Sequence, residues 1–253
     1  MTKQFESKVA LVTGGNAGIG QAIALAFAKE GAKVVITGRR ESEGNESVAL
    51  IKDAGGDAHF VKYDVSKAED IQAMVNACVE TYGGLDIAVN NAGVEGAPFV
   101  PAADLDEAVW DQVMDINLKG VWLSMKYEIP EILKRGGGAI VNMSSVAGLK
   151  GGRLGVSYYA SKHGVIGLTK AAAAEYAPHG IRINAVCPAV VKTAMVERTF
   201  LHNADLADML TKMHPVGRFG EPHEVASAVL WLCSEGASFV TGVAHPVDGG
   251  FMI

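Results

Sequence analysis

V-A-L-V-T-G-G-N-A-G-I-G, residues 9–20, joins a short apolar run to a turn rich in glycine. The run at 9–13 is typical of a strand buried on both faces. Its glycines follow the pattern G-x-x-x-G-x-G, which permits a tight turn and lets backbone N–H groups approach a pyrophosphate at the start of a helix. An ordinary structural turn would use the same glycines. We expect a dinucleotide site here, with contacts from Gly14, Asn16, Gly18, Ile19 and Gly20.

Outward from this turn, short apolar runs alternate with longer amphipathic segments. We expect strands at 9–13, 33–37, 59–62, 87–89, 139–143, 182–186 and 243–247. We expect helices at 19–30, 41–54, 68–82, 107–133, 156–177 and 222–232, with Pro130 kinking or ending the fourth of them. This alternation indicates an α/β protein whose parallel sheet carries helices on both faces. No repeat and no Pro- or Ser-rich linker interrupts it, so we assign residues 1–253 to a single domain.

Length, composition and charge fit this interpretation. The 253 residues are 49% hydrophobic, enough for a large core, and include 30 glycines that gather at the expected turns. A formal net charge of −6 without a basic stripe argues against a nucleic-acid partner. The first eight residues lack an apolar signal segment, and no apolar run is long enough to span a membrane. We therefore expect no membrane partner.

The cysteines and histidines indicate the compartment. Cys78, Cys187 and Cys233 are far apart and lie in apolar surroundings. No C-x-x-C, H-E-x-x-H or other zinc spacing occurs. We expect no metal site, and we expect buried thiols in the reducing cytoplasm.

The end of the second expected strand bears on the choice of cofactor. Dinucleotide folds often place an acidic residue here to bind the ribose 2′-hydroxyl of NAD. This chain instead has Gly38, Arg39 and Arg40. Two guanidinium groups suit a 2′-phosphate, so the sequence favours NADP(H). NAD(H) is the alternative if the two arginines simply face solvent.

Two further segments follow expected strands, where ligands bind in parallel sheets. Asp64 and Val65 follow the third strand, where a carboxylate can accept from the amino group of an adenine. A-V-N-N-A-G at 88–93 ends the fourth strand: its amides can join neighbouring loops, and its small residues let a cofactor approach the backbone. Further cofactor contacts are expected from Asp64, Val65, Asn91, Ala92 and Gly93.

The chemistry is expected at Ser145, Tyr158 and Lys162. Tyr158 and Lys162 are four residues apart and share one face of a helix, and Ser145 follows the fifth strand. A hydroxyl, a phenol and an ammonium so arranged can move a proton onto or off a substrate oxygen. A second Y-x-x-x-K, Tyr63 and Lys67, follows a strand and has Leu50 at the position of Ser145. We interpret that second pair as coincidence.

Asn117 is a further candidate, because Asn is a mediocre helix former and this one lies inside the fourth expected helix. Its amide could hold a water and link it to Lys162. A polar side chain satisfied by a neighbouring helix is the alternative.

Together these elements resemble the short-chain dehydrogenase/reductase family over essentially the whole chain. The matching motifs are T-G-x-x-x-G-x-G at 13–20, Asp64-Val65, N-N-A-G at 90–93, Asn117, Ser145, Y-x-x-x-K at 158–162 and V-D-G-G at 247–250. The resemblance implies a single-domain Rossmann fold, a doubly wound parallel sheet of about seven strands in the order 3-2-1-4-5-6-7. It also implies a nicotinamide cofactor and usually a homotetramer. It assigns a catalytic tetrad, two of whose members also contact the cofactor: Asn117, Ser145, Tyr158 and Lys162.

One departure from the family pattern follows the sixth strand. The family usually reads P-G there, and this chain has Pro188-Ala189. If that backbone needs a positive φ, the alanine lowers stability. The resemblance places nicotinamide contacts in the same segment, at Pro188, Val191 and Thr193, and we expect binding to survive.

The expected activity is interconversion of a secondary alcohol and a ketone by hydride transfer, with Tyr158 as general acid and base. A lysine cation about 4 Å from the phenol, at an effective dielectric near 20, is worth about 4 kcal/mol. That would bring the pKa of Tyr158 from about 10 towards neutrality. Ser145 would donate a hydrogen bond to the substrate oxygen as charge develops.

The small carbonyl or alcohol substrate is expected to bind between three segments, 94–104, 147–157 and 192–215, of which the last forms a lid. Its Met and Phe side chains predict an adaptable apolar surface, although half of the lid residues could simply pack its helices. The lid residues are Met195, Phe200, Leu201, His202, Met209, Met213 and His214. Substrate contacts are expected from Glu95, Ser145 and Tyr158.

Three other interpretations are open. A sugar-nucleotide epimerase shares Y-x-x-x-K but usually needs a larger C-terminal substrate domain. An enoyl reductase spaces its Tyr and Lys six apart, and residue 164 is glycine. A non-catalytic NADP(H)-binding sensor or scaffold would be expected to lose part of the tetrad, and all four residues are present.

Overall fold

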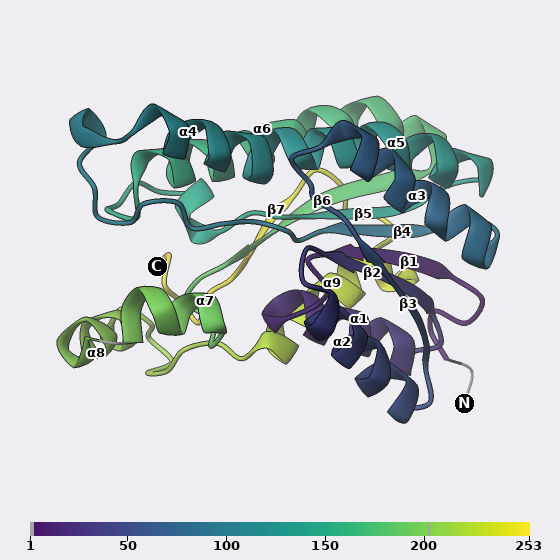
Figure 1. The fold of residues 1–253 in the computed structure, drawn as a ribbon, viewed down its shortest axis with the longest axis horizontal. Coiled ribbons are helices and arrows are strands. Elements are labelled where there is room, and N and C mark those ends of the chain that lie inside the picture. Colours follow the sequence, from purple (N-terminus) through teal and green to yellow (C-terminus); the bar gives the residue numbers. More distant parts are fainter. Residues whose placement is uncertain (1–2, 202) are drawn as a thin grey trace.

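A computed structural model describes residues 3–201 and 203–253 (Figure 1). Its centre is one sheet of seven strands in the order β3-β2-β1-β4-β5-β6-β7, with every neighbouring pair parallel. The strands are β1 (Val9–Thr13), β2 (Lys33–Gly38), β3 (Asp57–Lys62), β4 (Ile87–Asn90), β5 (Gly138–Met143), β6 (Ile181–Pro188) and β7 (Ala244–Val247). The predicted fold class and strand order are confirmed.

Helices cover both faces of this sheet (Figure 1). One face carries α1 (Gly18–Lys29), α2 (Glu41–Asp53) and α9 (Pro222–Cys233). The other carries α3 (Ala68–Tyr82), α4 (Glu107–Met114), α5 (Gly120–Lys134) and α6 (Val156–Tyr176). Each face has its own apolar core, and alternate residues of a strand serve the two: Val12 of β1 packs into one core and Leu11 into the other.

The fourth expected helix is built differently from the prediction. It is interrupted by a π-helical turn, Asp115–Lys119, between α4 and α5. It also runs past Pro130, which lies inside α5, so the helix does not end at the proline. Single π-helical turns insert one extra residue and are frequent at functional sites. This one carries Asn117.

The segment expected as a lid forms two short helices at one end of the molecule, away from the sheet layers (Figure 1). They are α7 (Ala194–Val196) and α8 (Ala204–Lys212), with a π-helical turn, Glu197–Leu201, after α7. Asn203 caps α8, because its side chain accepts from the backbone N–H of Leu206 at 3.1 Å. His202, also expected in the lid, lies outside the described residues.

Short 3₁₀ turns complete the chain at Ala102–Asp104, Val146–Gly148, Ala177–His179 and Glu235–Ala237. Within the two described ranges, no helix combines the length and the apolar character needed to cross a bilayer.

Candidate active site

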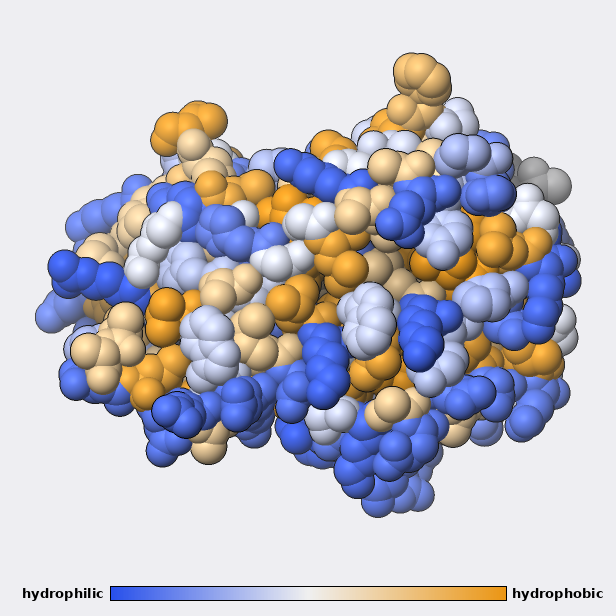
Figure 2. Space-filling model, turned by 90° about the horizontal axis from the view of Figure 1, so that it is seen from above, coloured by the Kyte–Doolittle hydropathy of each residue, from blue (hydrophilic) through white to orange (hydrophobic). Residues whose placement is uncertain are grey.

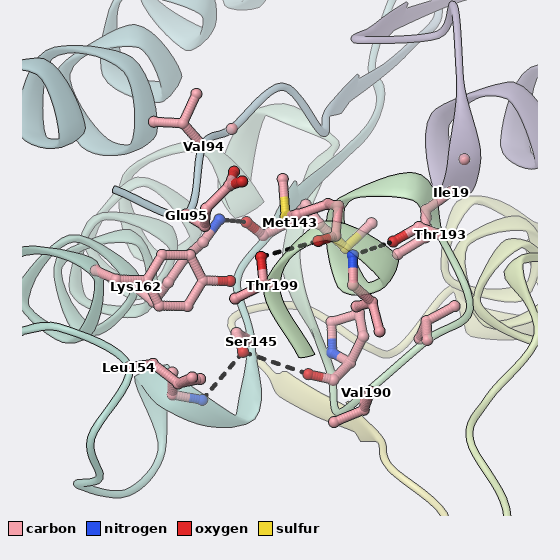
Figure 3. A pocket seen from close by; sticks show the side chains of 18 of the residues that line it. Ile19, Val94, Glu95, Met143, Ser145, Leu154, Lys162, Val190, Thr193 and Thr199 are labelled. Carbon is pink, nitrogen blue, oxygen red and sulfur yellow. Dashed lines mark hydrogen bonds between the residues drawn. The ribbon is translucent and has the colours of Figure 1, made fainter. Parts of the chain in front are cut away.

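A cavity of about 760 Å³ lies at the carboxyl ends of the strands (Figure 3). Its volume falls in the range of small-molecule and cofactor sites. It brings together every residue that the sequence predicts to contact cofactor or substrate: Gly14, Asn16, Gly18, Ile19, Gly20, Arg39, Arg40, Asp64, Val65, Asn91, Ala92, Gly93, Glu95, Ser145, Tyr158, Lys162, Pro188, Val191 and Thr193.

The glycine turn between β1 and α1 forms one end of the cavity. Gly14 and Gly18 have positive φ, 65° and 55°, which glycine adopts without strain. A Cβ at Gly20 would lie 2.3 Å from the carbonyl oxygen of Gly14. The amide of Asn91 donates to the carbonyl oxygen of Thr13 at 2.9 Å and so joins the turn to the segment after β4. The glycines are therefore required by the geometry of the turn.

This turn fits a dinucleotide. The N-terminus of α1 meets the cavity through glycine backbone, the arrangement that binds pyrophosphate in other proteins. Thr193 lies close to this turn: a Cβ at Gly18 would lie 3.2 Å from Thr193 Cγ2, so any side chain at position 18 would narrow the space between the turn and Thr193. At the end of β2, a Cβ at Gly38 would lie 2.4 Å from Asn16 Oδ1. Asn16 thus occupies the space that an acidic side chain at position 38 would need.

Of the two arginines after β2, Arg39 is the better placed for an anion. Arg40 Nε pairs with Glu43 in the first turn of α2. No salt bridge in the described part of the chain holds Arg39, which is exposed at the cavity edge. Burial raises the pKa of Asp64, but hydrogen bonds from Ser66 and the charge of Arg39 outweigh it and hold that pKa below its usual value.

Ser145, Tyr158 and Lys162 meet at the centre of the cavity. Lys162 Nζ donates to the carbonyl oxygen of Met143 at 2.9 Å and lies 5.6 Å from the centre of the Tyr158 ring. Ser145 Oγ donates to the carbonyl oxygen of Pro188 at 3.4 Å and accepts from the N–H of Ala147 at 3.1 Å (Figure 3). These contacts fix the lysine and the serine on the ends of β5 and β6.

The electrostatics of the pair differ from the prediction. Burial raises the pKa of Tyr158 above its ordinary value, although a hydrogen bond with Ser145 acts in the opposite direction. Burial also lowers the pKa of Lys162 to about 8. The expectation that Lys162 brings the pKa of Tyr158 near neutrality is wrong for this structure. Removal from water is the largest influence on the pKa of each group.

Asn117 does not line the cavity. Its Oδ1 accepts from the N–H of Val94 at 2.8 Å, and its Nδ2 donates to the carbonyl oxygen of Val94 at 2.9 Å and to Ser161 Oγ at 3.3 Å. Both hydrogens of the amide are therefore used within the protein, while Oδ1 accepts one hydrogen bond and has room for a second. The water expected on this amide stays a prediction. Asn117 fastens the π-helical turn to the segment after β4 and to α6, beside the tetrad lysine.

The second Y-x-x-x-K has a structural role. Tyr63 follows β3 and packs, 5% exposed, into the core on the α3 face. Lys67 precedes α3 and does not lie in it. The two side chains therefore do not share a helix face, which agrees with the interpretation of this motif as coincidence.

Ala189 is harmless. Among the described residues other than glycine, only Ser7 and Phe99 have positive φ. Ala189 donates its N–H to the carbonyl oxygen of Val247 at 3.2 Å and continues the pairing of β6 with β7. The P-A sequence therefore introduces no backbone strain.

The substrate end of the cavity closes through contacts that no sequence motif indicates. Arg198 Nη2 lies 3.4 Å from Glu95 Oε1. Glu95, which the sequence predicts to contact the substrate, is therefore paired with an arginine of the lid segment. Phe99 and Phe200 meet edge to face with ring centres 6.1 Å apart. Phe251, from the C-terminal segment, also lines the cavity. The ion pair joins residues 103 positions apart, and the ring pair joins the same two segments, which spacing along the chain does not reveal.

Comparison with known proteins agrees with this geometry. A family model described as enoyl-(acyl carrier protein) reductase matches residues 14–252. The chain is 45% identical to cyclohexanol dehydrogenase of Acinetobacter sp. (strain SE19), over 99% of this chain and 97% of that protein. It is 42% identical to 2,5-dichloro-2,5-cyclohexadiene-1,4-diol dehydrogenase of Sphingobium indicum, over 98% of each. The crystal structure of levodione reductase matches with a TM-score of 0.94 and 36% identity, over 97% of this chain and 98% of the other.

These matches extend over nearly the whole chain, and the solved structure agrees with its fold at a TM-score of 0.94. The named relatives are dehydrogenases and reductases of alcohols and ketones. The protein therefore belongs to the short-chain dehydrogenase/reductase family and is an oxidoreductase that acts on alcohols or ketones.

Proposed function

We propose that this protein interconverts a secondary alcohol and a ketone with NADP(H), using Tyr158 as general acid and base. The observation that carries the proposal is the continuous cavity from Arg39 to the group formed by Ser145, Tyr158 and Lys162. A nicotinamide bound there supplies or accepts the hydride. The residues of the chain would bind the cofactor and the substrate, orient them, and move the proton.

Each member of the group has a distinct task. Tyr158 donates its proton to the substrate oxygen during reduction, and its raised pKa keeps the phenol protonated at neutral pH. In alcohol oxidation it must first lose that proton, so this direction should become faster as pH rises. Ser145 donates a hydrogen bond to the same oxygen as charge develops. Lys162 binds the nicotinamide ribose hydroxyls, as in the family, from its anchor on Met143.

NADP(H) is proposed over NAD(H) because of the residues at the end of β2. Arg39 is placed to pair with a 2′-phosphate. Gly38 has no side chain, and Asn16 fills the space beside it. No carboxylate therefore stands at position 38 to accept a hydrogen bond from the ribose 2′-hydroxyl of NAD. Tyr158, Lys162 and the glycine turn would serve either cofactor.

The proposed substrates are cyclic secondary alcohols and ketones. Two of the relatives are named for six-membered carbon rings, cyclohexanol and a cyclohexadiene-diol. The substrate end of the cavity is lined mainly by apolar side chains from the loops after β4 and β5 and from the lid: Val94, Phe99, Leu154, Met195, Phe200 and Met209. We propose residues 192–215 as the lid over this end of the site.

A substrate screen tests the proposal. Cyclohexanol and cyclohexanone, with linear alcohols and ketones as comparison, are supplied with each cofactor, and the absorbance of the reduced nicotinamide is followed. Turnover that is fastest with the cyclic compounds and NADP(H) is expected. Binding of NADPH without turnover of any compound would favour the sensor or scaffold. An enoyl thioester is included because the matching model carries the enoyl reductase name; the four-residue Tyr–Lys spacing argues against its reduction.

We further propose a homotetramer in the cytoplasm. Trp110 of α4 and Trp122 of α5 are 37% and 48% exposed, and large exposed aromatic residues often mark interfaces. Figure 2 shows the helical face on which α3–α6 lie, where apolar side chains stand among charged ones. The three cysteines are buried thiols, which suits a reducing compartment. Light scattering on the purified protein tests the tetramer; a monomer would contradict it.

A further inference from the structure

Glu128 of α5 is a fully buried carboxyl group with an unusual environment. Its side chain lies in the core with an exposed fraction of 0%, and its only hydrogen bond in the described chain is to Oε2, donated by Asn90 Nδ2 at 3.1 Å. Asp86 is the other buried carboxyl group of the described chain. It pairs with Arg135 at 3.2 Å and Lys8 at 3.6 Å, and it accepts from the N–H of Val9. Among residues 3–201 and 203–253, no lysine or arginine pairs with Glu128 in this way.

Two oxygen atoms beside this contact have no partner. Glu128 Oε1 and Asn90 Oδ1 are both buried, and neither has a hydrogen bond to any residue that the structure describes. The Asn90 amide already uses its two hydrogens, one towards Glu128 Oε2 and one towards Asn142 Oδ1 at 3.0 Å. An ionised carboxylate only accepts, so it would leave both oxygens unsatisfied. A carboxylic acid carries a donor on one oxygen and can pair with an amide through two hydrogen bonds in a ring.

We propose that Glu128 is held as the neutral acid, that its Oε1 donates a proton to Oδ1 of Asn90, and that this pair positions the loops on both sides of the cofactor site. The contact satisfies both unpaired oxygens at once. It requires no rearrangement of the bond that Asn90 Nδ2 already makes to Oε2.

The position of the pair explains why it matters for the site. Asn90 ends β4, and the next residue, Asn91, joins the glycine turn through Thr13. Asn142 lies opposite Asn90 on β5, and the next residue, Met143, anchors Lys162. The acid–amide pair is therefore adjacent in sequence to Asn91, which holds the glycine turn, and it is bonded to Asn142, which is adjacent to the residue that holds the tetrad lysine.

The surroundings favour the neutral form. Burial raises the pKa of Glu128 to about 8, although the hydrogen bond from Asn90 lowers it. The titratable groups that face it are Cys78 of α3 and Tyr63 after β3; burial raises the pKa of each, and a charge on Glu128 would raise both further. Asp64 and Asp70 act on Tyr63 in the same direction. These groups add no positive charge that would stabilise a carboxylate.

Infrared spectroscopy tests the protonation directly. The wild-type protein is titrated from two pH units below to two above the raised pKa of about 8 of Glu128. We expect the carbonyl stretch of a protonated carboxylic acid at neutral pH and its loss near pH 8. Glu128→Gln should lack this band, and the matched control Asp86→Asn should keep it. Absence of the band from the wild type at neutral pH overturns the proposal and needs no variant.

Binding of NADPH tests the positioning role. Glutamine can donate to Asn90 Oδ1 and accept from its Nδ2, so Glu128→Gln should bind NADPH within about twofold of wild type at pH 7. Glu128→Leu loses both hydrogen bonds and should bind about tenfold more weakly, an effect that glutamine rescues. Above pH 8 the ratio of the wild-type Kd to the Gln-variant Kd should rise severalfold. Lys162 titrates in both proteins, so its effect cancels in that ratio. A ratio that stays constant with pH contradicts the proposal.

Discussion

Lys162 lies over the ring of Tyr158, with Nζ 5.6 Å from the ring centre, yet its hydrogen bond goes to the backbone of Met143. The lysine is thus held by β5 and not by the phenol. The Tyr158 hydroxyl is therefore not held by the lysine, and its hydrogen bond is with Ser145, the other group proposed to contact the substrate oxygen. Because the lysine and the phenol are held by different groups, the two side chains can be tested separately.

Tyr158→Phe should abolish turnover while NADPH binding stays nearly unchanged. The variant removes the proton that reduction requires and keeps the ring that packs in the cavity. Loss of a positioned general acid costs about 10²–10⁴-fold in rate. The measurements are kcat with a cyclic ketone and the Kd for NADPH. Tyr159→Phe is the matched control, because Tyr159 is adjacent, lines the same cavity and should keep kcat. More than a few per cent of wild-type kcat in Tyr158→Phe would contradict the role.

Lys162→Met should change how stability depends on pH. The pKa of Lys162 falls to about 8 on folding, from 10.5. Between these values the unfolded chain binds a proton that the folded protein does not, so the lysine makes wild-type stability rise with pH in that window. The rise is about 3 kcal/mol in all. The difference in unfolding free energy between wild type and Lys162→Met should therefore change from about pH 8 to pH 10.5. Lys170 is exposed on the same helix, so Lys170→Met should show no such change. A difference in unfolding free energy between wild type and Lys162→Met that stays constant with pH would refute the prediction.

Elements fixed by local pattern were predictable from the sequence. β1 and α3 have the predicted bounds, Val9–Thr13 and Ala68–Tyr82, because β1 is a continuous apolar run, α3 has a helical apolar periodicity, and glycine or charged residues flank both. The cofactor residues were predictable for a related reason. Ligands bind beyond the carboxyl ends of parallel strands, so each candidate could be found just after a strand.

Features that depend on contacts distant in sequence were not predictable. The π-helical turn at Asp115–Lys119 holds Asn117 against Val94, and nothing in D-I-N-L-K signals that partner. The raised pKa of Tyr158 depends on how completely the folded chain removes the phenol from water, which a four-residue spacing does not encode. Glu128 is one of four charged residues in the amphipathic helix α5, and a charged residue in such a helix normally lies on the solvent-exposed face.

Arg39→Asp should shift cofactor preference from NADP(H) towards NAD(H). The substitution removes the cation proposed to pair with a 2′-phosphate and introduces a carboxylate that would repel it and could accept from a 2′-hydroxyl. The ratio of kcat/KM for NADPH to that for NADH measures the effect. Arg40→Ala is the matched control: Arg40 is paired with Glu43, so its loss should change the ratio much less. An unchanged ratio in Arg39→Asp would remove the case for NADP(H).

Phe99→Ala should raise the KM for a cyclic ketone and leave kcat nearly unchanged. Phe99 meets Phe200 of the lid edge to face, and such a pair contributes about 0.5–1.5 kcal/mol beyond its buried area. If the pair holds the lid over bound substrate, its loss weakens binding about two- to tenfold. The substitution removes no group that takes part in the proton transfer at Tyr158, so kcat should stay nearly unchanged. Phe239→Ala is the control, because Phe239 is fully exposed and does not line the cavity.

A double-mutant cycle distinguishes a lid contact from two independent substrate contacts. Phe99→Ala and Phe200→Ala should each raise KM, and the double variant should be less impaired than the product of the two effects, because either substitution alone already removes the shared contact. KM values are measured with the same cyclic ketone at saturating NADPH. Effects that multiply in the double variant would show that each ring binds substrate by itself, and the lid would then close through other contacts, such as that between Arg198 and Glu95.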